Sequence, residues 1–498
     1  MIMVTKVLGL PKDKRLISNI ACLLLLLMTL SCQQNKKRDQ PKNVLLICID
    51  DLRPELNAFG AKHISSPNID QLASMGRPFH RHYVNAPSCG PSRYTLLTGQ
   101  YGIQYRRDGN QSLFARAEDL NNQSRPIDPS MPEWFSEHGY STVSVGKVSH
   151  HPGGRGDENW DNDSIPEMPG AWDRHIMPVG AWKHPRGAMH GLAYGKIRTK
   201  DDRDVLEAVD DEDSSYPDGL IAEAGLQQLE QLAASEKPFF LAIGIIKPHL
   251  PFGVPKKYLD LYEDVKIPAV LHPGKPSGET TWHHSGEFMS YHRQGNIDPR
   301  EDAEYALLLK KYYAACVSYA DKHVGDILSK LKETGADRNT IVVLWGDHGW
   351  HLGEHAIWGK HSLFEESLLS PLIIYDPDME NNGQESQAVV ETVDIFPTLL
   401  ELCKLPTPDF LHGTSLMPMM MDPKASGHPV VAYQSNATTI RTNSFRFIQH
   451  RSGAVELYDH ESEEGESHNI AAQHPEMVEA LRNQLNDRLK GQAFEWEL

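Results

Sequence analysis

Cysteine is scarce in this sequence, and the few cysteines do not form pairs. The 498 residues include six cysteines, of which Cys48, Cys89, Cys316 and Cys403 follow residue 40 at wide intervals. Disulfide frameworks and zinc sites need cysteines at short, paired spacings, so the sequence indicates neither. Cys48, Cys316 and Cys403 have apolar neighbours and are expected to be buried thiols.

The chain also has no excess of positive charge. The formal net charge is −18, which argues against nucleic acid as a partner and disfavours long-range attraction of a polyanion. An enzyme of this composition that acts on an anionic substrate would need its cations concentrated in one cleft. No internal repeat or low-complexity tract is present, and the 40% hydrophobic content is ample for a large core.

No hydrophobic run is long enough to span a bilayer comfortably. Residues 15–32 combine a basic flank, a short apolar run and small residues before Cys32, which is the pattern of a secretory signal. Cys32 stands where a bacterial lipoprotein is cleaved and lipidated, with plain secretion as the alternative. We expect a signal peptide over 1–31, a polar tether over 32–40, and export to the periplasm or outer membrane of a bacterium as a lipoprotein, with no membrane contact except the lipid anchor.

Strand-like and helix-like segments alternate along the chain. Four apolar runs have the length and β-branched content of strands buried on both faces of a parallel sheet, and helical periodicity lies between them. The alternation predicts an α/β fold with a mostly parallel, doubly wound sheet. The expected strands are Asn43–Ile49, Ser141–Val145, Phe239–Ile246 and Ile341–Trp345, and the expected helices begin at Ser66-Pro67 and cover Leu220–Ala234 and Glu304–Glu333.

After residue 423 the texture of the sequence changes. We expect a catalytic domain over 41–423 and a small α+β subdomain over 424–498. Long segments rich in glycine, proline and charge interrupt the larger domain, and loops of this length usually carry function, so we expect them to shape substrate access. The subdomain strands are expected at Val430–Tyr433, Ser444–Gln449 and Ala454–Tyr458 with a helix over Pro475–Lys490, and the long loops at 106–128, 153–216 and 268–301.

Each of the four expected strands ends in charged or imidazole side chains. In parallel sheets, ligands gather beyond the carboxyl ends of the strands, so these side chains should converge. Asp50 and Asp51 follow the first strand, and Asp347 and His348 follow the fourth. Adjacent carboxylates repel one another unless a positive charge lies between them, and oxygen ligands favour a hard cation such as calcium or magnesium. His348 is an unusual ligand for such an ion, and a simple turn is the alternative for the aspartate pair.

A set of cations belongs to the same predicted edge. Singly, each is more often a surface lysine or a hydrogen-bonded histidine. Together they would stabilise the negative charge of an oxyanion ester as its bond to the leaving oxygen breaks. The set consists of Arg93, Lys147, His150, His249 and Lys360.

The stretch SCGPSRYTLLTG, Ser88–Gly99, contains the pattern C-x-P-x-R at Cys89, Pro91 and Arg93. A half-buried cysteine at a helix start is the ordinary alternative for such a short motif. The pattern nevertheless resembles the core of type I sulfatases, in which this cysteine is oxidised to formylglycine. The resemblance extends to IDDLRPELNAFG, SPNIDQLA, HGYSTVSVGKVSH, KPHLPF, GDHGWHLGEH and ELYDHESEEGE, and is strongest to the iduronate-2-sulfatase branch and its bacterial relatives.

The resemblance implies an alkaline-phosphatase-like fold and a role for each motif residue. One calcium ion would be held by Asp50, Asp51, Asp347, His348 and the modified Cys89. Arg93, helped by Lys147 and His150, would steady the formylglycine, whose hydrate attacks sulfur. His249 or Lys360 would protonate the departing sugar oxygen, and His150 would accept a proton as sulfate is expelled. A formylglycine-generating enzyme is the implied partner, because an unmodified thiol could not expel sulfate.

Two departures from the common family pattern bear on these roles. Many sulfatases have Lys-x-His where this chain has Lys147-Val148-Ser149-His150, so that His151 is a rival for the role of His150. Gly90 replaces the commoner alanine or threonine within the motif, and a residue this small is expected to be harmless to the modifying enzyme.

The resemblance and the export signal together predict a sulfated, uronic-acid-containing carbohydrate substrate, such as glycosaminoglycan or ulvan fragments. A uronate needs a cation for its carboxylate, and Arg441 is the first candidate, with Arg53, Arg106 and Arg107 as others. Two other functions remain open. A phosphate or phosphonate ester hydrolase would use the same cradle, although the spare ligands for a second metal are only His351 and His355. A non-catalytic glycan-binding lipoprotein would keep the fold with an unmodified cysteine.

Overall fold

The computed structural model describes residues 40–105, 109–123, 127–152, 154, 165–380 and 383–489. The expected signal peptide, Cys32, Arg106 and Arg107 lie outside these ranges. Asn43–Leu498 forms one compact unit, so the expected boundary near residue 424 stays a prediction. No helix among the described residues is long and apolar enough to cross a membrane.

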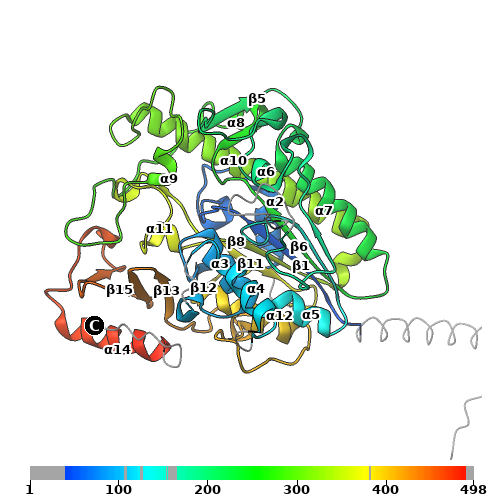
Figure 1. Ribbon diagram of the computed structural model, residues 1–498. Coiled ribbons are helices and arrows are strands. Elements are labelled where there is room, and N and C mark those ends of the chain that lie inside the picture. The colour runs from blue at the N-terminus through cyan, green and yellow to red at the C-terminus, as the bar shows by residue number, and fades with distance from the viewer. Residues whose placement is uncertain are drawn as a thin grey trace, which may run out of the picture. The chain divides into compact units, whose positions relative to one another are not determined.

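An eight-stranded sheet runs through this unit in the order β12-β2-β11-β8-β1-β6-β3-β4 (Figure 1). Only β11 is antiparallel to its neighbours; the other pairings are parallel, which confirms the predicted fold class. The strands are β1 (Asn43–Ile49), β2 (Arg77–Tyr83), β3 (Ser141–Gly146), β4 (Arg174–Ile176), β6 (Phe239–Ile245), β8 (Thr340–Gly346), β11 (Leu372–Tyr375) and β12 (Ser386–Glu391).

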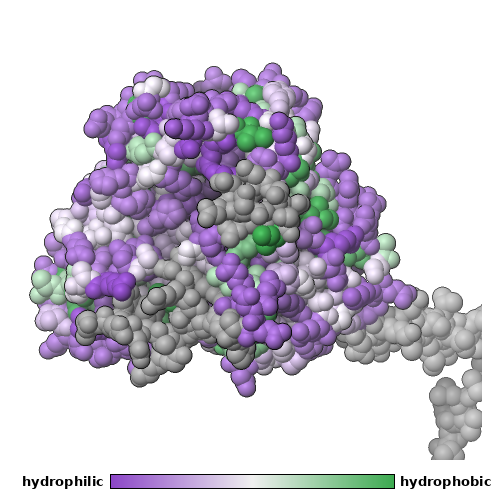
Figure 2. Space-filling view, viewed as in Figure 1, coloured by the Kyte–Doolittle hydropathy of each residue, from purple (hydrophilic) through white to green (hydrophobic). Residues whose placement is uncertain are grey.

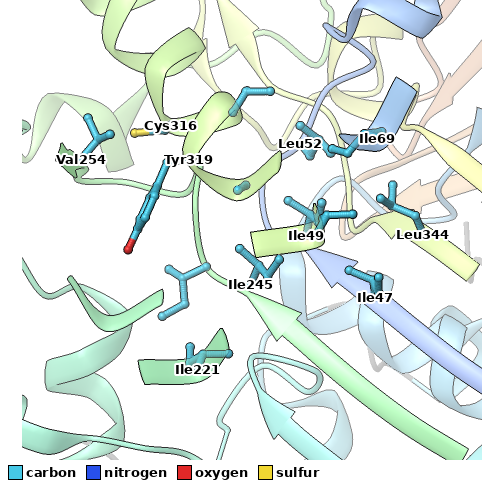
Figure 3. Packing of buried hydrophobic residues seen from close by; sticks show 14 of the residues in the cluster. Ile47, Ile49, Leu52, Ile69, Ile221, Ile245, Val254, Cys316, Tyr319 and Leu344 are labelled. Atoms are coloured by element: carbon cyan, nitrogen blue, oxygen red, sulfur yellow. The ribbon is translucent and has the colours of Figure 1, made fainter. Parts of the chain in front are cut away.

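The two faces of the sheet are buried under different helices. Successive side chains of a strand point to opposite faces, so Ile47 and Ile49 of β1 pack into one apolar cluster and Leu46 and Cys48 into another. Figure 3 shows the first cluster, where Ile49 lies beside Ile245 of β6, its partner in the sheet register. Because both faces of β1 are buried, its sequence is a continuous apolar run.

Helices α2, α7 and α10 cover the first face, and α3, α5 and α12 cover the second (Figure 1). The three helices expected from periodicity are all present. The helices are α2 (Pro67–Met75), α3 (Cys89–Thr98), α4 (Ser112–Asn122), α5 (Met131–Glu137), α6 (Pro185–Met189), α7 (Pro217–Ala233), α8 (Lys256–Asp260), α9 (Gly286–Met289), α10 (Ala303–Glu333), α11 (Glu365–Leu368), α12 (Ile395–Leu402), α13 (Met417–Met421) and α14 (Pro475–Leu489).

Sequence patterns miss several elements. β2, with the sequence RPFHRHY, has no apolar run to mark it. Its buried His82 contacts the Ser370 carbonyl just before β11 and the Thr392 hydroxyl just after β12. The expected loops are also partly ordered, since α4 lies in the first, α6 in the second and α9 in the third. Two short sheets complete this part of the chain: β5 (Leu206–Val209) with β7 (Phe252–Pro255), and β9 (His351–Leu352) with β10 (Trp358–Gly359).

A four-stranded antiparallel sheet and α14 form the C-terminal subdomain (Figure 1). Phe447 and Leu457 of the sheet pack with Leu481 and Leu485 of α14 in a cluster of their own. Three of the strands were expected; the second, rich in threonine, was not. They are β13 (Val430–Gln434), β14 (Ala437–Arg441), β15 (Phe445–His450) and β16 (Val455–Asp459).

The surface is largely hydrophilic, and the cysteines are buried. Hydrophilic residues dominate the face shown in Figure 2, with apolar residues in scattered spots. Cys48, Cys316 and Cys403 are buried thiols, as expected from their apolar neighbours. Burial raises the pKa of Cys48 and of Cys316 to about 12, which keeps both thiols protonated and unreactive.

His428 connects the subdomain to the larger sheet, and this contact should make stability depend on pH. Its Nε2 lies 2.9 Å from Oδ2 of the buried Asp394, and its Nδ1 lies 3.1 Å from the Pro429 carbonyl oxygen. Only an imidazolium can donate to both acceptors. Burial alone would lower the pKa of His428, but the hydrogen bond to Asp394 raises it to about 9.

A folded-state pKa above the unfolded value means that this stabilisation is complete below about pH 6.5 and is lost as the pH rises toward 9. We expect His428→Gln to destabilise the protein by up to about 3 kcal/mol at pH 6 and hardly at all at pH 9.5. Denaturant unfolding at both pH values measures this, with exposed His474→Gln as the matched control. An equal loss at both pH values would contradict the account.

Candidate active site

Three ionisable residues lie one step beyond the carboxyl ends of three parallel strands. Asp50, Lys147 and Asp347 follow β1, β3 and β8. Each keeps one more backbone hydrogen bond to the sheet: Asp50 N donates to Ile245 O at 3.2 Å, Lys147 N to Gly244 O at 2.9 Å, and Asp347 N to Ile49 O at 3.1 Å. The sheet therefore fixes the backbone from which these side chains project.

Gly244 permits the close approach of the strand ends. A Cβ built on it would lie 2.1 Å from the Lys147 carbonyl oxygen. Asp51 turns the chain immediately after Asp50: its φ of 57° is left-handed, a conformation that aspartate tolerates better than most residues. The turn breaks strand alternation, so the two adjacent carboxylates serve one site. Asp51 N also donates to Asp347 Oδ1 at 2.8 Å.

Cys89 is the first residue of α3, a helix whose residues are all buried. Ser88 and Gly90 both contact Asn110 Oδ1 at 3.1 Å. A Cβ on Gly90 would lie 2.3 Å from Asn110 Cα, so the glycine that replaces the commoner alanine or threonine is required for this packing. The helix start places the Cys89 side chain among the strand-end residues, where the positive end of the helix dipole favours anions.

Four polar groups surround the Cys89 sulfur. His348 Nε2 and Lys360 Nζ each lie 3.3 Å from Sγ, and Asp51 Oδ1 and Lys147 Nζ each lie 3.9 Å from it. We call Asp50, Asp51, Cys89, Asp347, His348 and Lys360 the Cys89 cluster; every member is buried. Residues separated by up to 310 positions in sequence thus meet at one point, as the strand-end argument predicts.

Arg93 ties the strand ends together. Its Nε donates to Asp347 Oδ2 at 3.0 Å and its NH2 to Asp50 Oδ1 at 3.1 Å. Its NH1 donates to the Lys147 and Val148 carbonyl oxygens. The carboxylates after β1 and β8 and the backbone carbonyls after β3 therefore hold this fully buried guanidinium. The planar fork of arginine suits several such acceptors at once.

The donor set fits a divalent cation. Ligand atoms of Asp50, Cys89, Asp347 and His348 lie within 4.8 Å of one another, and Asp51 and His249 share the same neighbourhood. Asp51 Oδ2 is buried and has no hydrogen-bond partner among the described residues. His348 Nδ1 donates to the Gly349 carbonyl at 2.9 Å, which leaves the Nε2 lone pair facing the cluster, as a metal-ligating histidine requires.

The electrostatics of the Cys89 cluster separate its members. Burial raises the pKa of Asp51 well above its usual range and that of Asp347 to about 7. Burial would raise the pKa of Asp50 too, but the adjacent Lys147 ammonium holds it well below its usual range. Crowded buried carboxylates of this kind are stabilised by a cation. Burial, with Asp50 next, raises the pKa of the Cys89 thiol well above its usual range, so the unmodified thiol is not an activated nucleophile.

His249 is held by the loop after β6. Asp218 accepts hydrogen bonds from Ile246 N at 2.6 Å and Lys247 N at 3.2 Å. Lys247 Nζ donates to the His249 carbonyl at 3.2 Å. His249 Nδ1 donates to the Leu250 carbonyl at 2.6 Å. Burial lowers the pKa of His249 well below its usual range, and the neutral ring therefore presents an unprotonated Nε2 that accepts hydrogen bonds.

The two adjacent histidines after β3 have different surroundings. His151 is buried, and Glu167 receives its backbone N–H at 2.7 Å and lies 3.3 Å from its Nδ1. His150 is half-buried and packs edge-on against His151, with 4.6 Å between ring centres. Burial lowers the pKa of His150 well below its usual range, with smaller contributions from His151 and the charge of Lys147. The strand-end charges thus act on His150, while a separate carboxylate holds His151.

Glu287 on α9 belongs to the site, and sequence patterns miss it. Its carboxylate lies 3.6 Å from Lys360 Nζ, 3.8 Å from His249 Nε2 and 3.4 Å from His361 Nε2. Burial alone would raise the pKa of Glu287, but the Lys360 ammonium lowers it well below its usual range. It lies inside the expected loop 268–301 with no strand end or motif to mark it; the predicted functional role of that loop was the only signal.

Glu287 should tune Lys360. Burial alone would lower the pKa of Lys360, but acidic neighbours, Asp51 first and Glu287 among them, raise it well above its usual range. We expect Glu287→Gln to lower kcat about tenfold and to move the alkaline limb of the pH profile of kcat/KM to lower pH, because a charge that favours the ammonium is removed. Exposed Glu301→Gln is the matched control. An unchanged alkaline limb would show that Glu287 does not act on Lys360.

Arg441 and Arg53, the two described cations expected to bind a uronate, do not belong to the Cys89 cluster. Arg441 is buried, lies 3.4 Å from Glu365 and donates to the Asn443 carbonyl at 3.2 Å. Arg53 lies 3.3 Å from Glu55 and 3.0 Å from Glu354. Both charges are thus neutralised within the protein.

The spare histidines form no second metal site beside Cys89. His351 Nε2 lies 2.8 Å from the Ser362 hydroxyl. His355 stacks on Phe364 and belongs to a separate group with Glu366 and Glu466. Among the described residues, the metal-capable groups that include Cys89 share Asp50 and thus define one site.

The fold and the site together define a class: an alkaline-phosphatase-like α/β protein with a small C-terminal subdomain, whose strand ends carry a buried donor set that fits a divalent cation. A family model makes the class specific. "Sulfatase" matches residues 42–405, and "N-sulphoglucosamine sulphohydrolase, C-terminal" matches residues 353–494. The chain belongs to the sulfatase family and is a hydrolase of that family.

Known relatives agree with this assignment. The chain is 32% identical over 415 residues to human iduronate 2-sulfatase, which covers 74% of this chain and 70% of that protein. It is 30% identical over 486 residues to a sulfatase of Formosa agariphila, covering 89% and 87% of the two chains. Among solved structures, the phosphonate monoester hydrolase of Agrobacterium radiobacter shares the fold with a TM-score of 0.72 at 21% identity, over 91% and 96% of the chains.

Proposed function

We propose that this protein removes sulfate from a sulfated, uronic-acid-containing carbohydrate, with Cys89 acting as formylglycine. The observation that carries the proposal is the convergence of Cys89, three buried aspartates and two lysines at the strand ends of a sulfatase-family sheet. A cluster with this charge is suited to an anionic ester that must be bound, polarised and cleaved.

The cation site is proposed to hold one calcium ion through Asp50, Asp51, Asp347, His348 and residue 89. Oxygen-rich donor sets favour hard cations, and the buried, unpartnered Asp51 Oδ2 supplies a ready ligand atom. Such an ion supplies Lewis-acid stabilisation of the negative charge on the ester oxygens. Arg93 forms ion pairs with both Asp50 and Asp347 and keeps their carboxylates in place.

The oxidised form of Cys89 supplies an aldehyde hydrate hydroxyl as nucleophile. The protonated thiol argues for such a conversion, because burial makes the thiolate unfavourable. Lys147, 3.9 Å from Sγ and paired with Asp50, is placed to hold the hydroxyl group and the sulfate oxygens. His150, whose pKa burial holds well below its usual range, is neutral and is proposed as the group that accepts a proton as sulfate leaves.

Lys360 is proposed as the group that protonates the departing sugar oxygen. It carries its proton at neutral pH, and its ammonium lies 3.3 Å from Sγ. Neutral His249 donates its one ring proton to the Leu250 carbonyl, so its Nε2 is suited to accept a hydrogen bond from a sugar hydroxyl. The two candidates for one role thus separate by protonation state.

The proposed preference for a uronate rests on the similarity to iduronate 2-sulfatase. The proposed location rests on the expected export signal. We propose that the protein works as an exported lipoprotein on polysaccharide fragments such as glycosaminoglycans or ulvan, and that a formylglycine-generating enzyme modifies it during production.

The direct test uses protein coexpressed with a formylglycine-generating enzyme. Peptide mass spectrometry is expected to find an aldehyde at position 89, and a panel of defined oligosaccharides should show sulfate release from 2-O-sulfated uronate. Release only from hexosamine or galactose esters would overturn the uronate preference and leave the sulfatase activity intact. Faster cleavage of aryl phosphonate than of aryl sulfate would instead favour the phosphonate hydrolase function.

A further inference from the structure

A small pocket that opens to solvent lies beside the active site, on the His249 side. It is lined by His190, Lys196, Arg198, Asp204, Pro251 and Tyr291, among others, and we call it the Arg198 pocket. Its residues come from the expected loop 153–216, the segment after His249, and the end of the loop that carries Glu287. Apart from Pro251, which belongs to the KPHLPF segment of His249, none of these named residues follows a strand end or lies in a motif singled out from the sequence.

The Arg198 pocket is continuous with the catalytic residues. The rings of His190 and His249 lie 5.4 Å apart between centres, and Pro251 is two residues beyond His249. Charges of both Arg198 and Glu287 act on the Tyr291 hydroxyl. A sugar whose ester oxygen is near Lys360 and His249 would therefore extend next into this pocket.

Among the cations of the Arg198 pocket, Arg198 is distinguished by its partners. Lys196 lies 3.0 Å from Asp202 and 2.9 Å from Asp204, so the two carboxylates outweigh its charge. Arg203 donates to the Thr199 carbonyl at 2.9 Å. Arg198 instead donates to the neutral Tyr291 hydroxyl at 2.7 Å and lies over the Tyr291 ring at 5.5 Å.

Tyr291 orients the Arg198 guanidinium without neutralising it. Burial raises the pKa of Tyr291 to about 12, so the phenol stays uncharged. No carboxylate of the described residues lies within ion-pair distance of Arg198. Its remaining N–H groups present the planar fork that matches an oxyanion, in a protein whose net charge is otherwise strongly negative.

We infer that the Arg198 pocket binds a second oxyanionic group of the substrate, either the carboxylate of the sulfated uronic acid or a neighbouring sulfate, while the ester to be cleaved occupies the Cys89 cluster. This inference rests on the proposed function. In this arrangement Arg198 selects the substrate by contacting the sugar, and the Cys89 cluster cleaves the ester.

The test compares two esters in wild-type protein and Arg198→Gln. One is a 2-O-sulfated uronate oligosaccharide, and the other is 4-nitrophenyl sulfate, which has no second oxyanion. We expect Arg198→Gln to lower kcat/KM for the oligosaccharide about 30-fold relative to the aryl ester, mainly through KM. Arg174→Gln, whose guanidinium contacts Gln231, is the matched control and should leave the ratio of the two esters unchanged.

Two modified substrates identify the oxyanion. In one substrate the uronate carboxyl is reduced to an alcohol, and in the other the neighbouring sulfate is removed. The change that deletes the bound group should lower kcat/KM of the wild-type protein by the same factor as the substitution does. That change should lower kcat/KM of Arg198→Gln no further. A measurement without cleavage supports the same point: the desulfated product should inhibit aryl ester hydrolysis more weakly in Arg198→Gln.

The outcomes separate the two levels of the argument. Equal loss on both esters, or loss together with a lowered Tm, would mean that Arg198 is structural and would overturn the inference while the proposed function stands. An unchanged ratio in Arg198→Gln would overturn it as well. Failure of the wild-type protein to release sulfate from any ester would overturn the proposed function and the inference with it.

Discussion

Cys89→Ala is expected to abolish sulfate release, with a loss of at least about 10⁴-fold in kcat. The alanine side chain removes both the proposed nucleophile and a ligand of the proposed cation. It is small enough for the first turn of α3, and it removes a sulfur that contacts Lys360 and His348 at 3.3 Å each. The fold should therefore survive, and release of sulfate measured by ion chromatography isolates the chemical loss.

Cys316→Ala is the matched control, because Cys316 is a buried thiol in α10 on the far side of β1 and β6 from α3. It should keep activity and lose only stability, about 1 kcal/mol for a small buried side chain. Cys89→Ser tests the need for conversion, since a serine hydroxyl reaches the same place. Full activity of Cys89→Ala would end the assignment of this residue as the nucleophile.

Removing the cation is expected to have the second largest effect. Three buried carboxylates face the proposed ion, and loss of the ion removes the positive charge that would stabilise the ester oxygens. We expect chelation followed by buffer exchange to reduce sulfate release by at least about 100-fold. Calcium added back at a hundredfold excess over its Kd should stabilise the protein by about 3 kcal/mol, measured as a rise in Tm.

Asp51→Asn tests the same site without relying on activity. Asp51 carries the buried oxygen with no hydrogen-bond partner among the described residues, and an amide in its place weakens a hard-cation ligand. The calcium-dependent rise in Tm should shrink or vanish in Asp51→Asn and remain in exposed Asp264→Asn. An undiminished rise in Asp51→Asn would place the calcium elsewhere.

Much of the site was predictable because strand ends in parallel sheets share an edge. β1, β3 and β8 were recognisable as apolar runs, and each ended in a residue that the structure places in or beside the Cys89 cluster. The motif around Cys89 added the one member that begins a helix. These predictions needed only local patterns and one rule of topology.

The residues missed lie in segments without periodicity. Glu287 and Arg198 are ordered by contacts with Lys360 and Tyr291, distant in sequence, so no local pattern marks them. Arg441 was a reasonable candidate by residue type, but its place on β14 pairs it with Glu365. The antiparallel direction of β11 likewise depends on its pairing with β2 and β8, which leave no signal in its own four residues.

The sequence by itself determined the α/β class, the apolar strands and the acidic, basic and thiol residues at their ends, because side-chain alternation and strand length are local properties of the chain. Only the tertiary structure decided which loop residues join them and which cations are already neutralised. Those outcomes depend on charges and hydrogen-bond partners that meet across hundreds of residues, and the partner of a buried charge cannot be deduced from the residue that carries it.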